Sequence, residues 1–178
     1  MARSIWTVGH STRTLEEFLG LLGAHAIEAV ADVRRFPGSK RFPHFSAESL
    51  AGSLQAKGIR YLALPALGGR RTPLRDSPNT GWKNAAFRGY ADHVRTAEFA
   101  EGLRALGDAA EASRLAIMCA EAVWWRCHRR IIADVLTAVG WEVRHLIDAG
   151  PPALHVLETP AHLVHGELSY APIGSLGI

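Results

Sequence analysis

The segment with the most reactive side chains lies between an expected buried strand and an expected helix. It reads Met118-Cys119-Ala120-Glu121, then five residues, then Cys127-His128-Arg129-Arg130. The N-terminus of a helix presents unpaired N–H groups and the positive end of the helix dipole, which favour a bound phosphate or carboxylate. The same field, together with the neighbouring arginines, lowers the pKa of a thiol, so either cysteine can be a thiolate near neutral pH.

The two thiols are expected to differ in exposure. Cys119 stands at the tip of the strand and is predicted to be the exposed thiol, acting as nucleophile or as partner of Glu121 in acid–base chemistry. Cys127 stands one helical turn before Ile131 and is predicted to face the core. For both thiols the alternative is a structural role as a small buried side chain. A Cys-x5-Arg phosphatase loop is excluded, because Arg126 stands one position too far from Cys119.

Three more expected strands end in polar or glycine residues: His10 and Ser11, Asp32 and Arg34, and the pair Gly68-Gly69. In open parallel sheets, ligands bind outside the carboxyl ends of the strands. We therefore expect the four strand ends to form one anion-binding pocket. Simpler roles are open for individual residues. Asp32 can pair with Arg34, and Glu121 can stabilise a helix terminus.

The elements that would position these residues alternate along the chain. Strands are predicted over residues 5–8, 29–33, 59–64, 115–119 and 143–147. Helices are predicted after the caps Thr14, Ser46 and Thr96, and from the thiol segment to Gly140. This alternation predicts an α/β fold, a three-layer α/β/α arrangement with a mostly parallel sheet of about five strands. Residues 65–85 are expected to form a long loop of the kind found in lids or mobile insertions, and residues 148–178 an irregular segment that wraps the surface.

Five motifs spread over residues 5–147 carry a family resemblance. They are Thr7-Val8-Gly9-His10-Ser11, Asp32-Val33-Arg34 with Pro37 and Ser39, Gly58-Ile59 with Tyr61, Leu67-Gly68-Gly69, and Cys119-Ala120-Glu121 with Cys127-His128-Arg129. Together they resemble the signatures of the domain of unknown function 488 family, and the last pair is the most specific. The resemblance implies an α/β fold and a pocket at these motifs, and it implies no particular reaction. Trp124-Trp125 departs from the family pattern and is either a base-stacking platform or a hydrophobic contact.

These observations predict an enzyme, a hydrolase or transferase, acting on a phosphate-bearing substrate such as a nucleotide or a nucleic acid. The histidines would move protons, and Arg34 and Arg129 would hold the anion. The expected catalytic residues are Cys119, Glu121, His10, His128 and Asp32, and the expected substrate-binding residues are Ser11, Arg34, Arg35, Ser39, Gly68, Gly69, Cys127 and Arg129.

Two other functions fit the same sequence. Basic and aromatic residues alternate in residues 34–45 and recur at Trp82-Lys83, which suits a non-catalytic nucleic-acid-binding module. The second alternative is a metal site, although Cys127 and His128 would point about 100° apart on a helix. No cofactor is predicted, and a divalent metal is the alternative; the acceptable zinc or iron ligands are His10, Cys119, Cys127 and His128.

Composition restricts the class of protein. The 178 residues are 48% hydrophobic and 21% charged, which suits one domain over residues 1–178. No apolar run approaches the ~20 residues of a membrane span, so no membrane partner is expected. The N-terminus runs straight into a strand-like segment and two cysteines make a poor disulfide framework, so the cytoplasm is the expected location. The net charge of +3 permits a phosphate-bearing partner without requiring one.

Overall fold

The central sheet has six strands in the order β3-β2-β4-β1-β5-β6. The computed structural model describes residues 3–38 and 40–174. The strands are β1 (Ser4–Gly9), β2 (Ala29–Asp32), β3 (Arg60–Ala63), β4 (Leu115–Cys119), β5 (Glu142–Leu146) and β6 (Ala153–Leu154). The first five are parallel to their neighbours, and only β6 runs antiparallel, beside β5. The predicted α/β fold with a mostly parallel sheet is confirmed.

In the part of the chain that the structure describes, five α-helices cover the sheet. They are α1 (Leu15–Ala24), α2 (Ala47–Gln55), α3 (Ala85–His93), α4 (Ala97–Ala112) and α5 (Arg129–Ala138). The predicted caps are confirmed: Thr14, Ser46 and Thr96 each accept a hydrogen bond from the backbone N–H three residues later, and Glu17 completes the capping box. Within the described ranges, no helix has both the length and the apolar character needed to cross a membrane.

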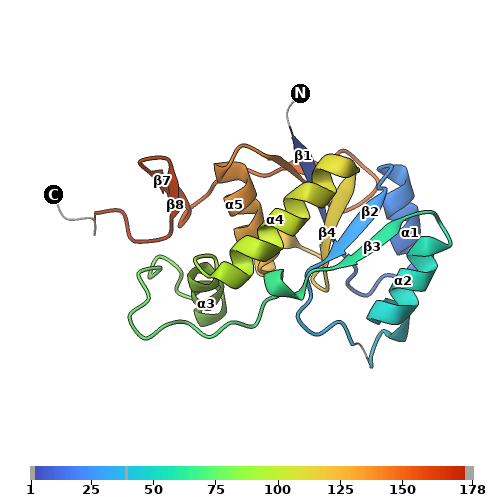
Figure 1. Ribbon diagram of the computed structural model, residues 1–178, viewed down its shortest axis with the longest axis horizontal. Coiled ribbons are helices and arrows are strands. Elements are labelled where there is room, and N and C mark those ends of the chain that lie inside the picture. The colour runs from blue at the N-terminus through green and yellow to red at the C-terminus, as the bar shows by residue number, and fades with distance from the viewer. Residues whose placement is uncertain (1–2, 39, 175–178) are drawn as a thin grey trace.

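The helices divide between the two faces of the sheet. Helices α1 and α2 lie on one side, and α3, α4 and α5 lie on the other (Figure 1). Successive side chains of a strand point to opposite faces, so each strand supplies both cores. In β4, Met118 packs with α1 and α2, whereas Ile117 and Cys119 pack with α3, α4 and α5. This alternation decides which side chains can meet at the carboxyl ends of the parallel strands.

Three parts of the chain differ from the prediction. Strand β6 adds a sixth strand, and the C-terminal segment also forms a hairpin of β7 (His162–Val164) and β8 (Glu167–Ser169). The chain does not enter α5 directly from β4 but first forms an irregular segment, residues 120–128, with one 3-10 turn at Trp124–Arg126. The long loop expected to be a lid is tied down by Asp92, whose carboxylate accepts hydrogen bonds from Leu74, Ser77 and Asn79.

Candidate active site

The two cysteines lie side by side, one at each end of the irregular segment between β4 and α5. Cys119 ends β4 and Cys127 follows the 3-10 turn, and their Sγ atoms are 3.2 Å apart. The prediction that Cys119 is the exposed thiol is wrong, since its exposed fraction is 2% and that of Cys127 is 8%. The reason is that β4 lies between β1 and β2 in the middle of the sheet, and alternation turns Cys119 into the core with α3, α4 and α5.

Arg129, in the first turn of α5, is completely buried against both thiols. Its Nε donates to Cys119 Sγ at 3.0 Å and to Cys127 Sγ at 3.3 Å. The other guanidinium nitrogens donate to Thr7 Oγ1 and to the carbonyl oxygens of Glu121 and Ala122. In the described part of the chain, no carboxylate forms an ion pair with this guanidinium. The thiols are therefore the groups that can supply its countercharge.

This environment separates the two thiols by acidity. Burial favours the neutral form of Cys127, but the hydrogen bond from Cys119 and the charge and hydrogen bonds of Arg129 outweigh it, and the pKa of Cys127 falls from 9.0 to about 6. Burial and the neighbouring Cys127 raise the pKa of Cys119 well above 9.0. Cys127 is therefore the thiolate near neutral pH, although Cys119 was the predicted nucleophile.

Both thiols reach a pocket of about 210 Å³ at the carboxyl edge of the sheet, which we call the thiol pocket. A neighbouring hollow of about 320 Å³ shares five of its residues and adds Arg126. Seven predicted site residues line the thiol pocket, which places side chains from three strand ends around one space. The complete lining is Arg34, Arg35, Phe36, Gly69, Arg70, Cys119, Ala120, Glu121, Cys127 and His128.

An exposed aromatic ring with two guanidinium groups near it lines the thiol pocket. Phe36 is 63% exposed, and the guanidinium carbons of Arg35 and Arg70 lie 5.5 and 5.9 Å from its ring centroid. Arg35 also donates to the carbonyl oxygen of Arg70 at 3.0 Å. Arg70 has a φ of 58°, a strained conformation for a residue with a Cβ, and such strain is concentrated at functional sites. Phe36 and Arg70 were not among the predicted site residues.

His128 lies at the base of the pocket as a neutral imidazole. Its Nε2–H donates to the carbonyl oxygen of Val33 at 3.1 Å, which leaves Nδ1 as the basic nitrogen. Burial lowers the pKa of His128 from 6.5 to about 4, so the ring is uncharged at pH 7. A Cβ on Gly69 would lie 2.9 Å from Nδ1, and a Cβ on Gly68 would lie 2.6 Å from Cβ of Arg35. The glycine pair thus lets this loop approach both residues closely.

His10 and Asp32 lie on the other face of the sheet and do not line the thiol pocket. Asp32 holds Arg34 through two hydrogen bonds of 2.8 and 2.6 Å and accepts a third from Tyr61. His10 stacks on Phe45, with ring centroids 4.3 Å apart, and accepts from Arg34. The alternative in which Asp32 pairs with Arg34 is confirmed, and Arg34 is therefore less available to a ligand than expected.

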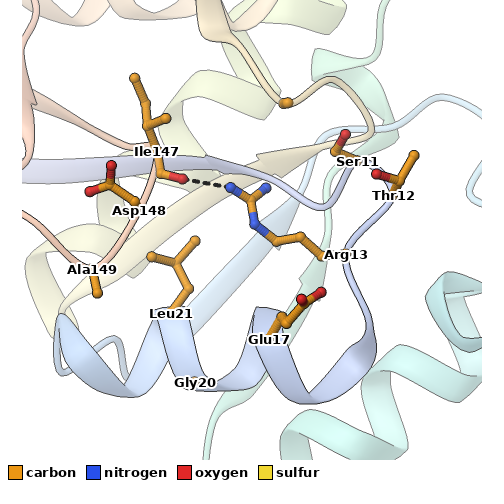
Figure 2. A pocket seen from close by; sticks show the side chains of 10 residues that line it. Ser11, Thr12, Arg13, Glu17, Gly20, Leu21, Ile147, Asp148 and Ala149 are labelled. Carbon is orange, nitrogen blue, oxygen red and sulfur yellow. Dashed lines mark hydrogen bonds between the residues drawn. The ribbon is translucent and has the colours of Figure 1, made fainter.

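The other residues at the end of β1 have different surroundings. A Cβ on Gly9 would lie 1.7 Å from the carbonyl oxygen of Glu121, so the backbone that approaches this glycine belongs to the protein itself and not to a ligand. Ser11 lines a separate hollow between the ends of β1 and β5, where Arg13 donates to the carbonyl oxygen of Ile147 at 2.6 Å (Figure 2). Ser39 lies outside the described residues.

A buried chain of hydrogen-bonded polar groups extends from Arg129, and it was not predicted from the sequence. Thr7 Oγ1 contacts both Arg129 and Nδ1 of His145. From His145 the chain runs through His155 and Asp134 to the hydroxyl of Tyr170. The signal in the sequence was a polar residue inside an otherwise apolar pattern, His145 in a strand and Asp134 in a helix. Trp124, part of the unexplained tryptophan pair, stacks on His145 with centroids 4.2 Å apart.

The proposed metal ligands do not assemble. His10 is separated from the two thiols by the sheet, and His128 contacts the carbonyl oxygen of Val33. Across residues 3–38 and 40–174, no group of three or more His, Cys, Asp or Glu side chains could hold a metal ion. The carboxyl ends of the strands instead bring together the Cys127 thiolate, the neutral imidazole of His128 and several guanidinium groups.

Comparison with known proteins agrees with the motifs. No curated protein and no solved structure gives a significant match to the chain. A family model described as "Domain of unknown function DUF488" matches residues 14–136, more than half of the chain, and this range contains the thiol pocket. The chain belongs to this family, Domain of unknown function DUF488.

Proposed function

We propose that this protein is an enzyme in which the Cys127 thiolate attacks a phosphate-bearing substrate, with nucleotides or a nucleic acid as the substrate class. The single observation that carries the proposal is the buried Arg129 guanidinium, which has two thiols and no described carboxylate as its acidic neighbours. A buried charge without a partner is strongly destabilising. The fold therefore favours an anion at the sulfur position, and a thiolate in an accessible pocket is a nucleophile.

The substrate class follows from the exposed side of the pocket. Arg35, Arg70 and Arg126 present positive charge around it, and guanidinium groups bind phosphate through two parallel hydrogen bonds. Phe36 offers an exposed ring on which a nucleobase can stack, a contact worth about 1–3 kcal/mol. A phosphate next to an aromatic base satisfies both features, which supports a nucleotide more than a simple phosphate ester.

The chemistry can be written with the residues present. Cys127 Sγ forms a bond to phosphorus while the bond to the leaving oxygen breaks. Nδ1 of His128, neutral at pH 7, accepts a proton from the water or alcohol that then releases the phosphoryl group from sulfur. The leaving oxygen takes its proton from solvent, and the proton that His128 accepts later returns to solvent. Glu121, an exposed carboxylate in the same pocket, relays these protons. Arg129 holds the sulfur in its ionised form and acts as a positioning residue.

The test is a search for the covalent adduct. The protein is mixed with p-nitrophenyl phosphate and with a panel of nucleoside phosphates, quenched in acid, and analysed by intact mass and peptide mapping. We expect a phosphoryl or nucleotidyl group on Cys127, none in Cys127→Ser, and an adduct still formed in Cys119→Ser. Absence of an adduct and of turnover with every probe, while Cys127 remains readily alkylated, would remove phosphate chemistry from the proposal.

A second candidate function is supported by the exposed Phe36 alone. Its position beside Arg35 and Arg70 suits the binding of single-stranded nucleic acid without catalysis. That function predicts salt-dependent binding of a fluorescent RNA or DNA oligonucleotide that is weakened in Phe36→Ala and unchanged in Cys127→Ser. Binding by both variants at wild-type affinity would exclude this surface.

A further inference from the structure

The proposed nucleophilic role of Cys127 does not require a second thiol, yet Cys119 lies in contact with it. Their Sγ atoms are 3.2 Å apart, and the S–S distance in a disulfide is about 2 Å, so an approach of about 1 Å would join them. Cys119 is fixed at the end of β4, whereas Cys127 lies in the irregular segment before α5. The chain contains no other cysteine. A disulfide between two residues of this sequence can therefore be either an internal bond between Cys119 and Cys127 or a bond between molecules.

We propose that Cys119 and Cys127 form a reversible disulfide when an oxidant of the peroxide class enters the thiol pocket. The inference goes beyond the proposed function and does not depend on it, because it concerns only the two sulfur atoms. It assigns a redox modification site to the pocket. If Cys127 is also the nucleophile, the same bond blocks the enzyme.

The geometry brings the reactants together without rearranging the fold. Both cysteines line the thiol pocket, which at about 210 Å³ is far larger than a peroxide. Arg129 Nε donates to both sulfurs and holds them on the same side of the guanidinium. The backbone N–H of Arg129 also donates to Cys127 Sγ, at 3.4 Å. These contacts keep Cys127 ionised and within reach of its partner.

The reaction balances with peroxide as the oxidant. The Cys127 thiolate attacks one peroxide oxygen, the O–O bond breaks, and the released hydroxide takes a proton to become water, which leaves Cys127 as a sulfenic acid. Cys119 Sγ then attacks the Cys127 sulfur, the S–O bond breaks, and the proton of the Cys119 thiol leaves with the hydroxide as a second water. Two thiols and one peroxide give one disulfide and two waters.

Arg129 makes the bond easy to reduce. In the disulfide neither sulfur carries charge, so the buried guanidinium keeps its hydrogen bonds to Thr7 and Glu121 but loses its anionic neighbour. A site that stabilises the reduced thiolate form gives an oxidising disulfide. A dithiol reductant restores the two thiols and is itself converted to a disulfide. The pair is therefore suited to a switch and not to a permanent crosslink.

The experiment uses the whole chain and hydrogen peroxide in small molar excess at neutral pH, followed by acid quenching and intact mass. We expect the wild-type monomer to lose the mass of two hydrogens and to regain it with dithiothreitol. In Cys119→Ser the reaction should stop at the sulfenic acid, which dimedone traps. In Cys127→Ser we expect oxidation to be at least tenfold slower, because burial still raises the pKa of the remaining Cys119 thiol.

The wild-type protein alone can overturn the inference, whether or not the variants fold. Gain of oxygen without loss of hydrogen, or dimers on a non-reducing gel in place of the internal bond, would each contradict it. The outcome is also separate from that of the proposed function. A disulfide without any phosphoryl adduct refutes only the phosphate chemistry, and an adduct without a disulfide refutes only the redox pair.

Discussion

At the scale of single residues, the chemistry of the site depends on which cysteine is ionised. Cys119 was predicted to be the exposed nucleophile because it ends a strand, which is a property of its position along the chain only. The structure shows that both thiols are buried and that hydrogen bonds, not exposure, separate them. The difference comes first from the hydrogen bond between the two thiols, which lowers the pKa of Cys127 and raises that of Cys119. Arg129 adds to it, because its backbone N–H donates only to Cys127.

The first prediction concerns the pH dependence of alkylation. A thiol is alkylated as the thiolate, so the rate of iodoacetamide labelling follows the ionisation of the thiol. The rate at Cys127 should therefore rise with pH around a midpoint near 6, whereas the midpoint for an ordinary cysteine is near 8.5. At pH 7 we expect Cys127 to react faster than free cysteine. Rates follow from peptide mapping after timed quenching. Cys127→Ser is the control, in which Cys119 should label slowly over the same range, and faster labelling of Cys119 would contradict the assignment.

The second prediction concerns the group that stabilises the thiolate. In Arg129→Lys the charge is kept but the fork of donors to the sulfurs, Thr7 and the Glu121 carbonyl is lost. We expect the alkylation midpoint of Cys127 to rise and the free energy of unfolding to fall by about 1–3 kcal/mol, because buried acceptors lose their partners. Urea unfolding and the alkylation profile measure the two effects. An unchanged midpoint in a folded variant would mean that Arg129 does not control the thiol.

At the scale of elements, Gly9 sets the distance between β1 and the segment 120–128. The third prediction is that Gly9→Ala destabilises the protein by about 1–3 kcal/mol or more, because its Cβ would overlap the Glu121 carbonyl and push the wall of the thiol pocket outward. Gly20→Ala, in α1 with open space around it, is the matched control and should be neutral or stabilising by up to ~1 kcal/mol. Chemical denaturation measures both, and equal effects would show that Gly9 carries no special constraint.

The elements themselves were largely predictable, and the pairing of side chains was not. The caps Thr14, Ser46 and Thr96 and the alternation of strands with helices follow from local rules, so the α/β fold could be predicted. The faces of the strands could not, because parallel strands buried on both sides are apolar throughout and show no alternation in the sequence. His10 and Cys119 end neighbouring strands, yet their side chains point to opposite cores.

For the same reason, only part of the candidate site could be predicted. Residues that follow the carboxyl ends of strands, such as Arg35, Gly69 and Glu121, do line one pocket, as predicted. The roles of Arg129 and Phe36 depend on contacts that only the assembled fold creates. One hydrogen-bond partner of the Arg129 guanidinium, Thr7, is 122 positions away in the chain.

At the scale of the whole molecule, buried neutral histidines make the fold sensitive to acid. Burial lowers the pKa of His10 and His128 from 6.5 to about 4 and that of His145 to about 2. Below pH 6.5 the unfolded chain therefore binds more protons than the folded one. Stability is then lost as the pH falls from 6.5 towards 4, by about 1.4 kcal/mol per pH unit for each such histidine.

Cys127 shifts stability in the same direction between pH 9.0 and about 6, because its folded pKa is also the lower one. The fourth prediction is therefore a steady fall in the urea midpoint from pH 8 to pH 4.5. His128→Gln, if it folds, should flatten the lower part of that curve. A flat profile in the wild-type protein would contradict the neutral state of these rings.

The C-terminal segment is part of the same core. Tyr170 donates to Asp134 of α5 at 2.9 Å, and its carbonyl oxygen accepts from Gly81 in the long loop. The fifth prediction is that Tyr170→Phe lowers the free energy of unfolding by about 1–3 kcal/mol, because one oxygen of buried Asp134 loses its donor. Thermal unfolding followed by circular dichroism measures the loss. No change would show that this hydroxyl contributes nothing to holding the segment.

The central place of β1 has a consequence for how the chain matures. On a ribosome, β1 emerges before the other strands of the sheet, but its two neighbours are β4 and β5, which end at residues 119 and 146. Until those segments have been translated, Ile5, Trp6 and Val8 have no strand beside them. Such distant pairing slows folding and leaves apolar surface open to aggregation. Nascent chains stalled before residue 119 should therefore be recognised by chaperones and degraded by proteases far more readily than chains released at full length.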